Sequence, residues 1–221
     1  MVYGNIERAV FLDRPNRFIA HAALDGRTVT AHVKNTGRCR ELLIPGAEVW
    51  LTSSDNPLRK TAYDLVAVRK DSGLLINIDS QAPNRIAFEW LREQGYDRIL
   101  PEYGFGDSRI DFYMDRGSEK TLLEVKGCTL ERDGVGFFPD APTVRGVKHL
   151  RELIRAKAEG YRSVLAFVIQ MDGVTEVRPN LETDPAFGAA MEDARRAGVE
   201  VWFLLCHVEP NAVSAIGRME G

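Results

Sequence analysis

Two carboxylate residues, Asp111 and Glu124, lie thirteen positions apart in two short segments that resemble β-strands, and this stretch constrains the fold most strongly. Apolar and polar residues alternate in both segments, as in a strand with one buried face. The sequence between them, Asp115–Glu119, has the composition of a turn. Because the midpoint of the two carboxylates falls between Gly117 and Ser118, a symmetric hairpin places Asp111 directly opposite Glu124.

Strand alternation gives this hairpin one apolar face and one polar face. The polar face carries Asp111, Glu124 and Lys126, with Arg109 opposite Lys126, and we expect it to line a cleft. The apolar face is expected to join the core and carries Ile110, Phe112, Leu123 and Val125. Like charges that face each other destabilise a sheet, so the opposed carboxylates require a reason, and a divalent cation between them is the simplest one.

The chemistry of the polar face suits phosphodiester hydrolysis. Magnesium prefers hard oxygen ligands, commonly one or two carboxylates together with water and phosphate. Asp111 and Glu124 supply the carboxylates, the Val125 carbonyl supplies a third ligand, and Mg²⁺ or Mn²⁺ is the expected cofactor. The Lys126 ammonium can orient an attacking water and stabilise developing negative charge. An exposed hairpin with weak surface ion pairs is the alternative interpretation of the same residues.

Composition is that of an ordinary globular protein. Apolar residues make up 44% and charged residues 28%, and the apolar stretches are too short to span a bilayer. The N-terminus does not resemble a signal peptide, and three widely spaced cysteines indicate a reducing compartment, so we expect a cytoplasmic protein with no membrane partner. The net charge of −3 argues against an indiscriminately basic nucleic-acid binder, so nucleic-acid binding has to be judged from local basic patches.

Two regions of different character meet near Ser80–Pro83. Residues 1–80 read as an all-β module with a hairpin turn at Asp25–Gly26, and a barrel of five or six strands is the expected packing. Residues 81–221 alternate strands with helices, which predicts a sheet with flanking helices. Besides the hairpin at 107–126, strands are expected at 17–24, 27–33, 48–53, 61–69, 74–78, 129–132, 162–170 and 199–207, and helices at 84–94, 143–159 and 185–197.

The expected helix at 143–159 carries a basic ridge. Its apolar stripe is expected to contain Val144, Val147, Leu150 and Ile154. Basic residues recur three or four positions apart on another face. They are Arg145, Lys148, Arg151 and Arg155, with His149 as a further candidate contact. The ridge can follow DNA phosphates toward the cleft, although a solvated helix face would show the same pattern.

A second basic patch lies in the first region, in two loops. Its expected phosphate contacts are Lys34, Asn35, Arg38 and Arg40 in one loop, and Arg59 and Lys60 after another turn. Loops on the rim of a small barrel suit contacts to nucleic-acid phosphates. Aromatic side chains that could stack on bases are few, so we expect phosphate contact without sequence-specific recognition.

The hairpin resembles the core of the PD-(D/E)XK nucleases, and the chain is similar to the sugar fermentation stimulation protein A (SfsA) family over nearly its whole length. The stretches that carry this resemblance are Gly106–Phe112, Glu124–Lys126, Asn35–Gly37, Ser54–Pro57, Phe138–Ala141, Thr143, Arg145–Gly146 and Lys148–Leu150. The resemblance implies an N-terminal OB-like β-barrel, a restriction-endonuclease-like mixed sheet with flanking helices, DNA binding and a link to sugar metabolism. Asp79–Ser80 departs from the Asn-Thr that the family usually shows.

By position in the family pattern, the resemblance makes Asp111, Glu124 and Lys126 the catalytic set. A glutamate on the preceding helix often completes such sites, and Glu89 is the candidate here for a further metal ligand. The leading hypothesis is a DNA-binding protein with a magnesium-dependent phosphodiesterase site. Two alternatives stay open: a non-catalytic DNA-binding regulator of sugar metabolism on a nuclease scaffold, and a metal-dependent enzyme acting on a small phosphorylated or sugar substrate.

Overall fold

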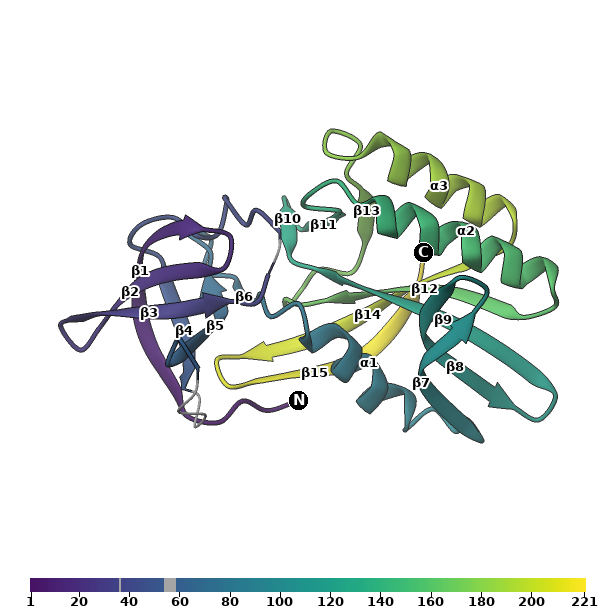
Figure 1. Cartoon of the computed structure of the whole chain (residues 1–221), viewed down its shortest axis with the longest axis horizontal. Coiled ribbons are helices and arrows are strands. Elements are labelled where there is room, and N and C mark those ends of the chain that lie inside the picture. Colours follow the sequence, from purple (N-terminus) through teal and green to yellow (C-terminus); the bar gives the residue numbers. More distant parts are fainter. Residues whose placement is uncertain (36, 54–58) are drawn as a thin grey trace.

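The structure, a computed structural model, describes residues 1–35, 37–53 and 59–221. A barrel and a larger sheet with helices lie side by side along the long axis of the molecule (Figure 1). The Ser54–Pro57 motif and Thr36 fall outside the described residues. Within the described ranges, no helix is long and apolar enough to cross a membrane.

The first part is a closed barrel of five strands, β1 to β5, with β6 added beside β5. β3 pairs with β5 as well as with β2, so the order β3-β2-β1-β4-β5 closes on itself. Asp25 and Gly26 join β2 to β3 with positive φ angles of 50° and 74°, which suit a two-residue hairpin turn. The barrel predicted from the sequence is confirmed. Its strands are β1 (Ile6–Asn16), β2 (Ile19–Leu24), β3 (Arg27–Val33), β4 (Glu48–Ser53), β5 (Tyr63–Arg69) and β6 (Leu75–Asn77).

The second part is a mixed six-stranded sheet with the order β15-β14-β12-β9-β8-β7. β12 runs parallel to both of its neighbours, whereas the other pairs are antiparallel. A small sheet of β10, β11 and β13 adjoins the barrel, where Lys70 Nζ contacts Glu131 Oε2 at 2.6 Å. The strands are β7 (Arg98–Phe105), β8 (Ser108–Arg116), β9 (Glu119–Cys128), β10 (Leu130–Arg132), β11 (Val135–Phe138), β12 (Arg162–Ile169), β13 (Val177–Pro179), β14 (Glu200–Glu209) and β15 (Ala212–Glu220).

Helices cover both faces of this sheet (Figure 1). Alternate residues of β12 enter two separate core clusters: Leu165 and Phe167 pack with α2 and α3, while Val164 and Ala166 pack with α1. A strand that is buried on both faces is apolar throughout, which explains the apolar run in β12. The mixed sheet with flanking helices is therefore confirmed. The helices are α1 (Ala82–Leu91), α2 (Val144–Ala158) and α3 (Pro185–Arg196).

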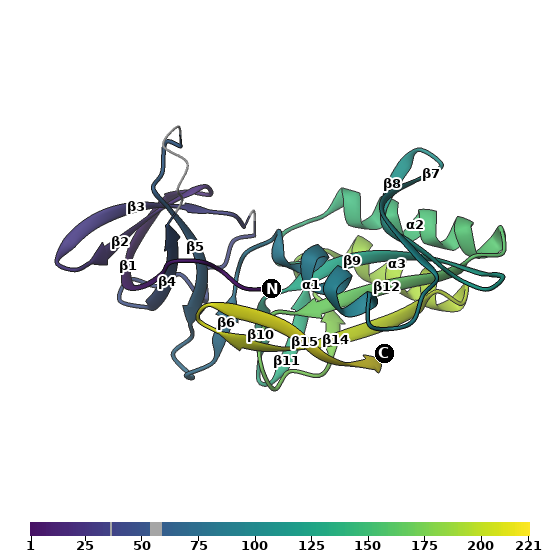
Figure 2. The same cartoon turned by 90° about the horizontal axis from the view of Figure 1, so that it is seen from below.

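The two parts are joined by polar contacts and by the start of the chain. Gln170 Nε2, at the end of β12, donates to Asn77 Oδ1 of β6 at 2.8 Å. Val2 forms a β-bridge with Ala212 of β15, so residues 1–3 lie against the second part rather than in the barrel (Figure 2). The predicted boundary at residue 80 separates the two parts along the sequence. In space, however, residues 1–3 pack against the second part.

Candidate active site

The carboxylate hairpin has the register that the sequence predicts. β8 and β9 pair from the turn at Gly117 as far as Phe112 and Leu123, so Asp111 and Glu124 come next in the register. From there on, β8 continues beside β7, and β9 continues beside β12. The sheet divides between β8 and β9 at this point, and the two carboxylate residues lie at the division.

Asp111 connects the two diverging strands and α1 through its side chain. Its Oδ2 accepts a hydrogen bond from the Val125 backbone N–H at 2.7 Å, and its Oδ1 accepts one from Asn84 Nδ2 at 2.8 Å. Burial raises the pKa of Asp111 above its ordinary value, and the nearby negative charge of Glu124 raises it further. The ionised form of Asp111 would therefore gain from a positive charge placed beside it.

The apolar alternation of β8 changes at the same point. Phe112 and Leu123 share the cluster packed with α1, as the predicted apolar face requires. Ile110 instead belongs to the cluster that contains Leu150 of α2. The expectation that Ile110 and Phe112 share one face is therefore wrong, because β8 leaves β9 between them and does not continue as a regular neighbour.

Glu124 is almost fully buried, with 1% of its surface exposed. Its Oε1 contacts both the Lys126 ammonium and His149 Nδ1. Burial disfavours the charged form, but the bonds from His149 and Lys126 outweigh burial and hold the pKa of Glu124 below its ordinary value. Its Oε2 is buried and has no hydrogen-bond partner among the described residues. One oxygen of an ionised carboxylate is thus left for a ligand.

His149 contacts Glu124 from α2 rather than extending the exposed basic ridge. It is 5% exposed, and its Nε2 accepts a hydrogen bond from Arg145 Nε at 3.3 Å. The predicted apolar stripe is displaced, because Val144 is 88% exposed. The buried residues of α2 are Gly146, His149, Leu150, Leu153 and Ala156. His149 lies three or four positions along the helix from other buried residues, and this spacing is the sequence signal for its burial.

α1 contributes Asn84 to the site, a residue that sequence reasoning did not assign there. The candidate Glu89 contacts other groups: its carboxylate pairs with the Met1 amine at 2.6 Å and with Arg85 Nε at 3.0 Å. Five positions separate Asn84 from Glu89, which places their side chains about 140° apart around the helix. The structure therefore does not bring Glu89 to Asp111. The only sequence signal for Asn84 was its place at the helix start.

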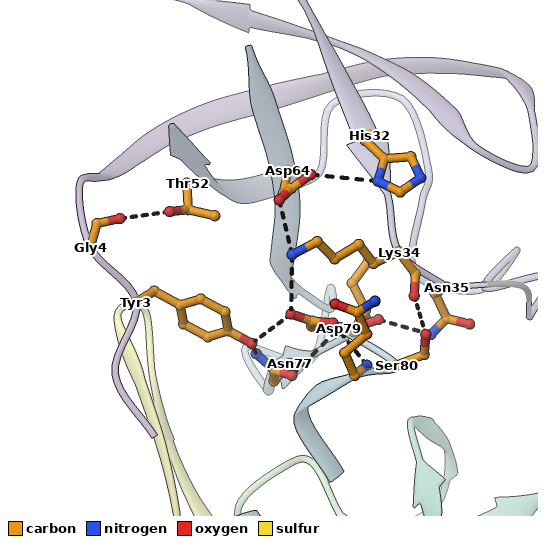
Figure 3. Close-up of polar contacts among 12 residues, drawn as sticks. Tyr3, Gly4, His32, Lys34, Asn35, Thr52, Asp64, Asn77, Asp79 and Ser80 are labelled. Atoms are coloured by element: carbon orange, nitrogen blue, oxygen red, sulfur yellow. Dashed lines mark hydrogen bonds and ion pairs between the residues drawn. The ribbon is translucent and has the colours of Figure 1, made fainter. Parts of the chain in front are cut away.

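Two of the expected DNA contacts, Lys34 and Arg59, bind a buried carboxylate within the barrel. Lys34 Nζ lies 2.9 Å and Arg59 Nη1 lies 3.0 Å from Asp64 Oδ2. Lys34 also points toward Asp79, at 3.9 Å (Figure 3). Although burial opposes ionisation of Asp64, the bonds from Arg59 and Lys34 lower its pKa. These two positive charges are therefore engaged inside the protein and are poorly placed for phosphate contact.

The other expected DNA contacts differ in exposure. Asn35 lines a hollow between the barrel and the second part, and its amide donates to the Ile78 carbonyl at 3.0 Å. The side chains that lie exposed on the surface are Arg38, Arg40, Lys60, Arg145, Lys148 and Arg151. They lie in both parts of the molecule, so the basic surface expected from the sequence is present but contains fewer residues than expected.

Part of the basic ridge also holds the tip of the β7–β8 hairpin. Lys148 Nζ donates to the Asp107 carbonyl at 3.0 Å. The Arg155 guanidinium lies 4.8 Å from the centre of the Phe105 ring, a cation–π contact. Since Asp111 lies on the same hairpin, α2 contacts the site from two sides: through this tip and through His149.

Comparison with known proteins follows the two parts of the chain. A family model described as "SfsA N-terminal OB domain" matches residues 12–78, and one described as "Sugar fermentation stimulation protein RE domain" matches residues 81–212. The chain belongs to the sugar fermentation stimulation protein family. A homologue from Desulfitobacterium hafniense (strain Y51) is 51% identical over 219 residues, which cover 97% of this chain and 95% of that protein.

Other members of the sugar fermentation stimulation protein family agree over the full length. A homologue from Ruminiclostridium cellulolyticum is 46% identical over 224 residues, covering 100% of this chain and 99% of that protein. The solved structure of Pyrococcus furiosus SfsA in complex with Ca²⁺ matches with a TM-score of 0.87 at 29% identity, covering 99% of this chain and 96% of that one. The OB barrel and the following mixed sheet are thus shared with this family.

Segments on which the resemblance to the SfsA family rests lie at the junction of the two parts. Asp140 Oδ2 accepts a hydrogen bond from the Cys39 backbone N–H at 2.8 Å, which ties the barrel loop to the Phe138–Ala141 segment. Thr143 then caps α2 by accepting a hydrogen bond from the Gly146 backbone N–H at 3.0 Å. The same segments therefore join the barrel to the second part and begin the helix that contacts the carboxylates.

The groups at the division of the sheet fit a divalent cation. Asp111 and Glu124 follow directly after the last β8–β9 pair, Phe112 and Leu123, and Glu124 Oε2 is a buried oxygen without a partner among the described residues. Carboxylate oxygens are the ligands that Mg²⁺, Mn²⁺ and Ca²⁺ prefer. Within the described ranges, no group of three or more Asp, Glu, His or Cys side chains is placed to hold a metal. A cation here would complete its shell with main-chain carbonyl, water or phosphate oxygens, as magnesium commonly does.

Proposed function

We propose that this protein binds DNA and hydrolyses phosphodiester bonds with a divalent cation held by Asp111 and Glu124. The observation that carries the proposal is the environment of Glu124. Its carboxylate is buried, its pKa is lowered, Lys126 and His149 occupy one oxygen, and the other oxygen has no partner among the described residues. A buried, half-satisfied carboxylate beside a second acid is costly unless a cation completes it.

The residues of the site divide the chemistry among them. Asp111, Glu124 and the Val125 carbonyl would hold Mg²⁺ or Mn²⁺. A cation held there would stabilise the negative charge that builds on the phosphoryl oxygens. The Lys126 ammonium, next to Glu124, orients the attacking water and adds positive charge where the transition state needs it. His149 fixes the orientation of the Glu124 carboxylate from the outside.

The proposed substrate is DNA, bound through its phosphates without sequence-specific recognition. Residues 12–78 match the family's OB domain, a fold that often binds oligonucleotides. Exposed basic residues in both parts could contact the backbone, and contacts to phosphate position a nucleic acid without reading its sequence. The residues proposed for this contact are Arg38, Arg40, Lys60, Arg145, Lys148 and Arg151.

A cleavage assay with a matched variant tests the proposal. Purified protein is incubated with single- and double-stranded DNA in Mg²⁺, in Mn²⁺ and in EDTA. We expect cleavage that requires the metal and is lost in Glu124→Gln, which keeps the shape of the side chain but removes its charge. Arg92→Gln, an exposed substitution at the residue that follows α1, is the control and should cleave normally. Cleavage that persists in Glu124→Gln, or its absence under every metal condition, would contradict the catalytic proposal.

A non-catalytic DNA-binding regulator of sugar metabolism is the second candidate. The observation that favours it is that Lys126 and His149 already provide bonds to Glu124, so part of the buried charge is compensated by the protein itself. This candidate predicts DNA binding that weakens steeply with salt and no turnover with any metal. Cleavage abolished by Glu124→Gln would exclude it.

A further inference from the structure

A hollow of ≈ 280 Å³ lies between the barrel and the second part. The barrel contributes Asn35 and Gly37, and the second part contributes most of the remaining wall. A Cβ atom on Gly37 would lie 2.6 Å from Asp140 Oδ2, so only glycine allows the barrel loop to approach this wall without displacing it. The volume is close to the lower limit of about 300 Å³ for small-molecule sites, which suits one small organic group.

The hollow borders the candidate active site on two sides. Pro83 lines it, and the next residue, Asn84, donates to Asp111. Gly127 also lines it, and the preceding residue, Lys126, contacts Glu124. A group seated in the hollow would therefore be adjacent to a phosphate held at the two carboxylates.

The lining of the hollow is unsuited to phosphate and suited to an uncharged ring. Among the described residues that line it, none is lysine, arginine or histidine, and Asp140 would repel an anion. Gln170 Nε2 is occupied by Asn77 Oδ1 and by the Asp79 carbonyl, which leaves the amide oxygen to accept a hydrogen bond from a ligand. Proline and aromatic residues, among them Pro83 and Phe137, supply apolar wall. Flat apolar walls with hydrogen-bond acceptors match a nucleobase.

A second hollow continues from the first, and its wall carries both basic and acidic side chains. The two share Leu130 and Asp140, and the second has a volume of ≈ 440 Å³. Arg38 and Arg40 line it, are exposed, and form no ion pair with any residue that the structure describes. Phosphate is the natural partner for such arginines. The order is therefore the carboxylate site, a hollow without basic side chains, and a hollow of mixed charge with Arg38 and Arg40 in its wall.

We propose that the first hollow binds one unpaired base of the DNA strand whose phosphate lies at Asp111 and Glu124, while Arg38 and Arg40 hold a neighbouring phosphate. This inference rests on the proposed function, since it names the form of DNA that the site accepts. A base inside a duplex cannot enter a hollow of this size without leaving its stack. The substrate class is therefore single-stranded DNA, an overhang or a frayed end.

Filling the hollow tests the proposal by binding alone. Ala141→Phe and Thr129→Phe each place a ring among the lining residues, and Ala197→Phe, at an exposed position directly after α3, is the matched control. A short single strand with one 2-aminopurine, and a blunt duplex of the same sequence, are titrated in Ca²⁺, so that a cation offsets the charge of the carboxylates, and binding rather than turnover is measured. Wild type should bind the single strand more tightly and change the 2-aminopurine fluorescence on binding.

The two filled variants should lose about tenfold in affinity for the single strand, together with the fluorescence change, and keep wild-type affinity for the duplex. Wild-type affinity for the single strand in both filled variants would overturn the proposal. An equal loss for single strand and duplex would also overturn it, because the hollow would then have no specific role for an unpaired base. If the selective loss is found but the wild type fails to cleave in Mg²⁺, the base site stands and the nuclease proposal fails.

Discussion

His149 on α2 forms a buried hydrogen bond through Nδ1 to Oε1 of Glu124 on β9. Lys126 contacts the same oxygen, so Oε2 is the one that lacks a partner among the described residues. Arg145 in turn donates to the other nitrogen of His149. The helix that carries part of the basic surface thus also positions a carboxylate of the candidate active site.

Replacement of His149 should affect turnover more than DNA binding. Because the side chain is buried and bonded to a charged group, His149→Ala should lower the free energy of unfolding by about 1–3 kcal/mol. We expect kcat for cleavage to fall at least tenfold with little change in KM, and partial rescue in His149→Gln. Urea unfolding and steady-state cleavage measure both effects. A rise in KM at unchanged kcat would instead support the phosphate contact first expected for His149.

Asp111→Asn should stabilise the metal-free protein. Burial and the charge of Glu124 raise the pKa of Asp111, so its protonated form is favoured in the folded state. The stability due to that form is fully present below the ordinary carboxyl pKa and is lost as the pH rises through the raised value. The variant should therefore gain about 1 kcal/mol at pH 7, and the gain should disappear at low pH.

Urea unfolding of wild type and Asp111→Asn in EDTA, at several pH values, measures this difference. Adding Mg²⁺ should then stabilise the wild type by mass action and leave the variant largely unchanged. A variant that is less stable than wild type at pH 7 without metal would show that the charged form of Asp111 is already compensated within the protein.

Lys34 should matter for stability rather than for DNA affinity. Its ammonium pairs with the buried Asp64, so Lys34→Met leaves Asp64 with the Arg59 guanidinium and the His32 ring as its side-chain partners among the described residues. We expect a loss of about 1–3 kcal/mol in unfolding free energy and nearly unchanged DNA binding. Arg38→Gln is the comparison and should show the reverse pattern. Equal weakening of DNA binding by both variants, with stability intact, would restore Lys34 as a phosphate contact.

Arg38 and Arg40 should account for part of the salt dependence of DNA binding. Each phosphate contact that is removed lowers the slope of log K against log salt by about 1, so the double variant Arg38→Gln/Arg40→Gln should lose about 1–2 from that slope. Fluorescence anisotropy over a series of salt concentrations gives the slope for both proteins. An unchanged slope would mean that the DNA backbone does not contact this loop.

The local features of the fold could be predicted from sequence. The register of Asp111 and Glu124 follows from the symmetry of the hairpin about its turn, which depends only on neighbouring residues. β7 was not predicted, because Pro101 and Gly104 break the strand pattern in the sequence. In the structure, the strand is also irregular at Glu102, which has a φ of +53°. It forms nonetheless because β8 pairs along its length. β15 was missed as well, since its sequence is mostly polar or small and its strand depends on pairing with β14.

The contacts between distant elements could not be predicted in the same way. The sequence marks Lys34 as basic, but its pairing with Asp64 depends on how β3 and β5 meet when the barrel closes. The contact of His149 with Glu124 likewise depends on how α2 packs on β9. In both cases the side chain's chemistry was evident, while its partner was set by tertiary structure.

Anomalous scattering from crystals of the protein soaked in Mn²⁺ tests the central claim most directly. The account predicts a manganese peak bonded to Glu124 Oε2 and to the Asp111 carboxylate, and its loss in crystals of Glu124→Gln. A map with no peak at these carboxylates, or a peak there that Glu124→Gln leaves unchanged, would contradict it.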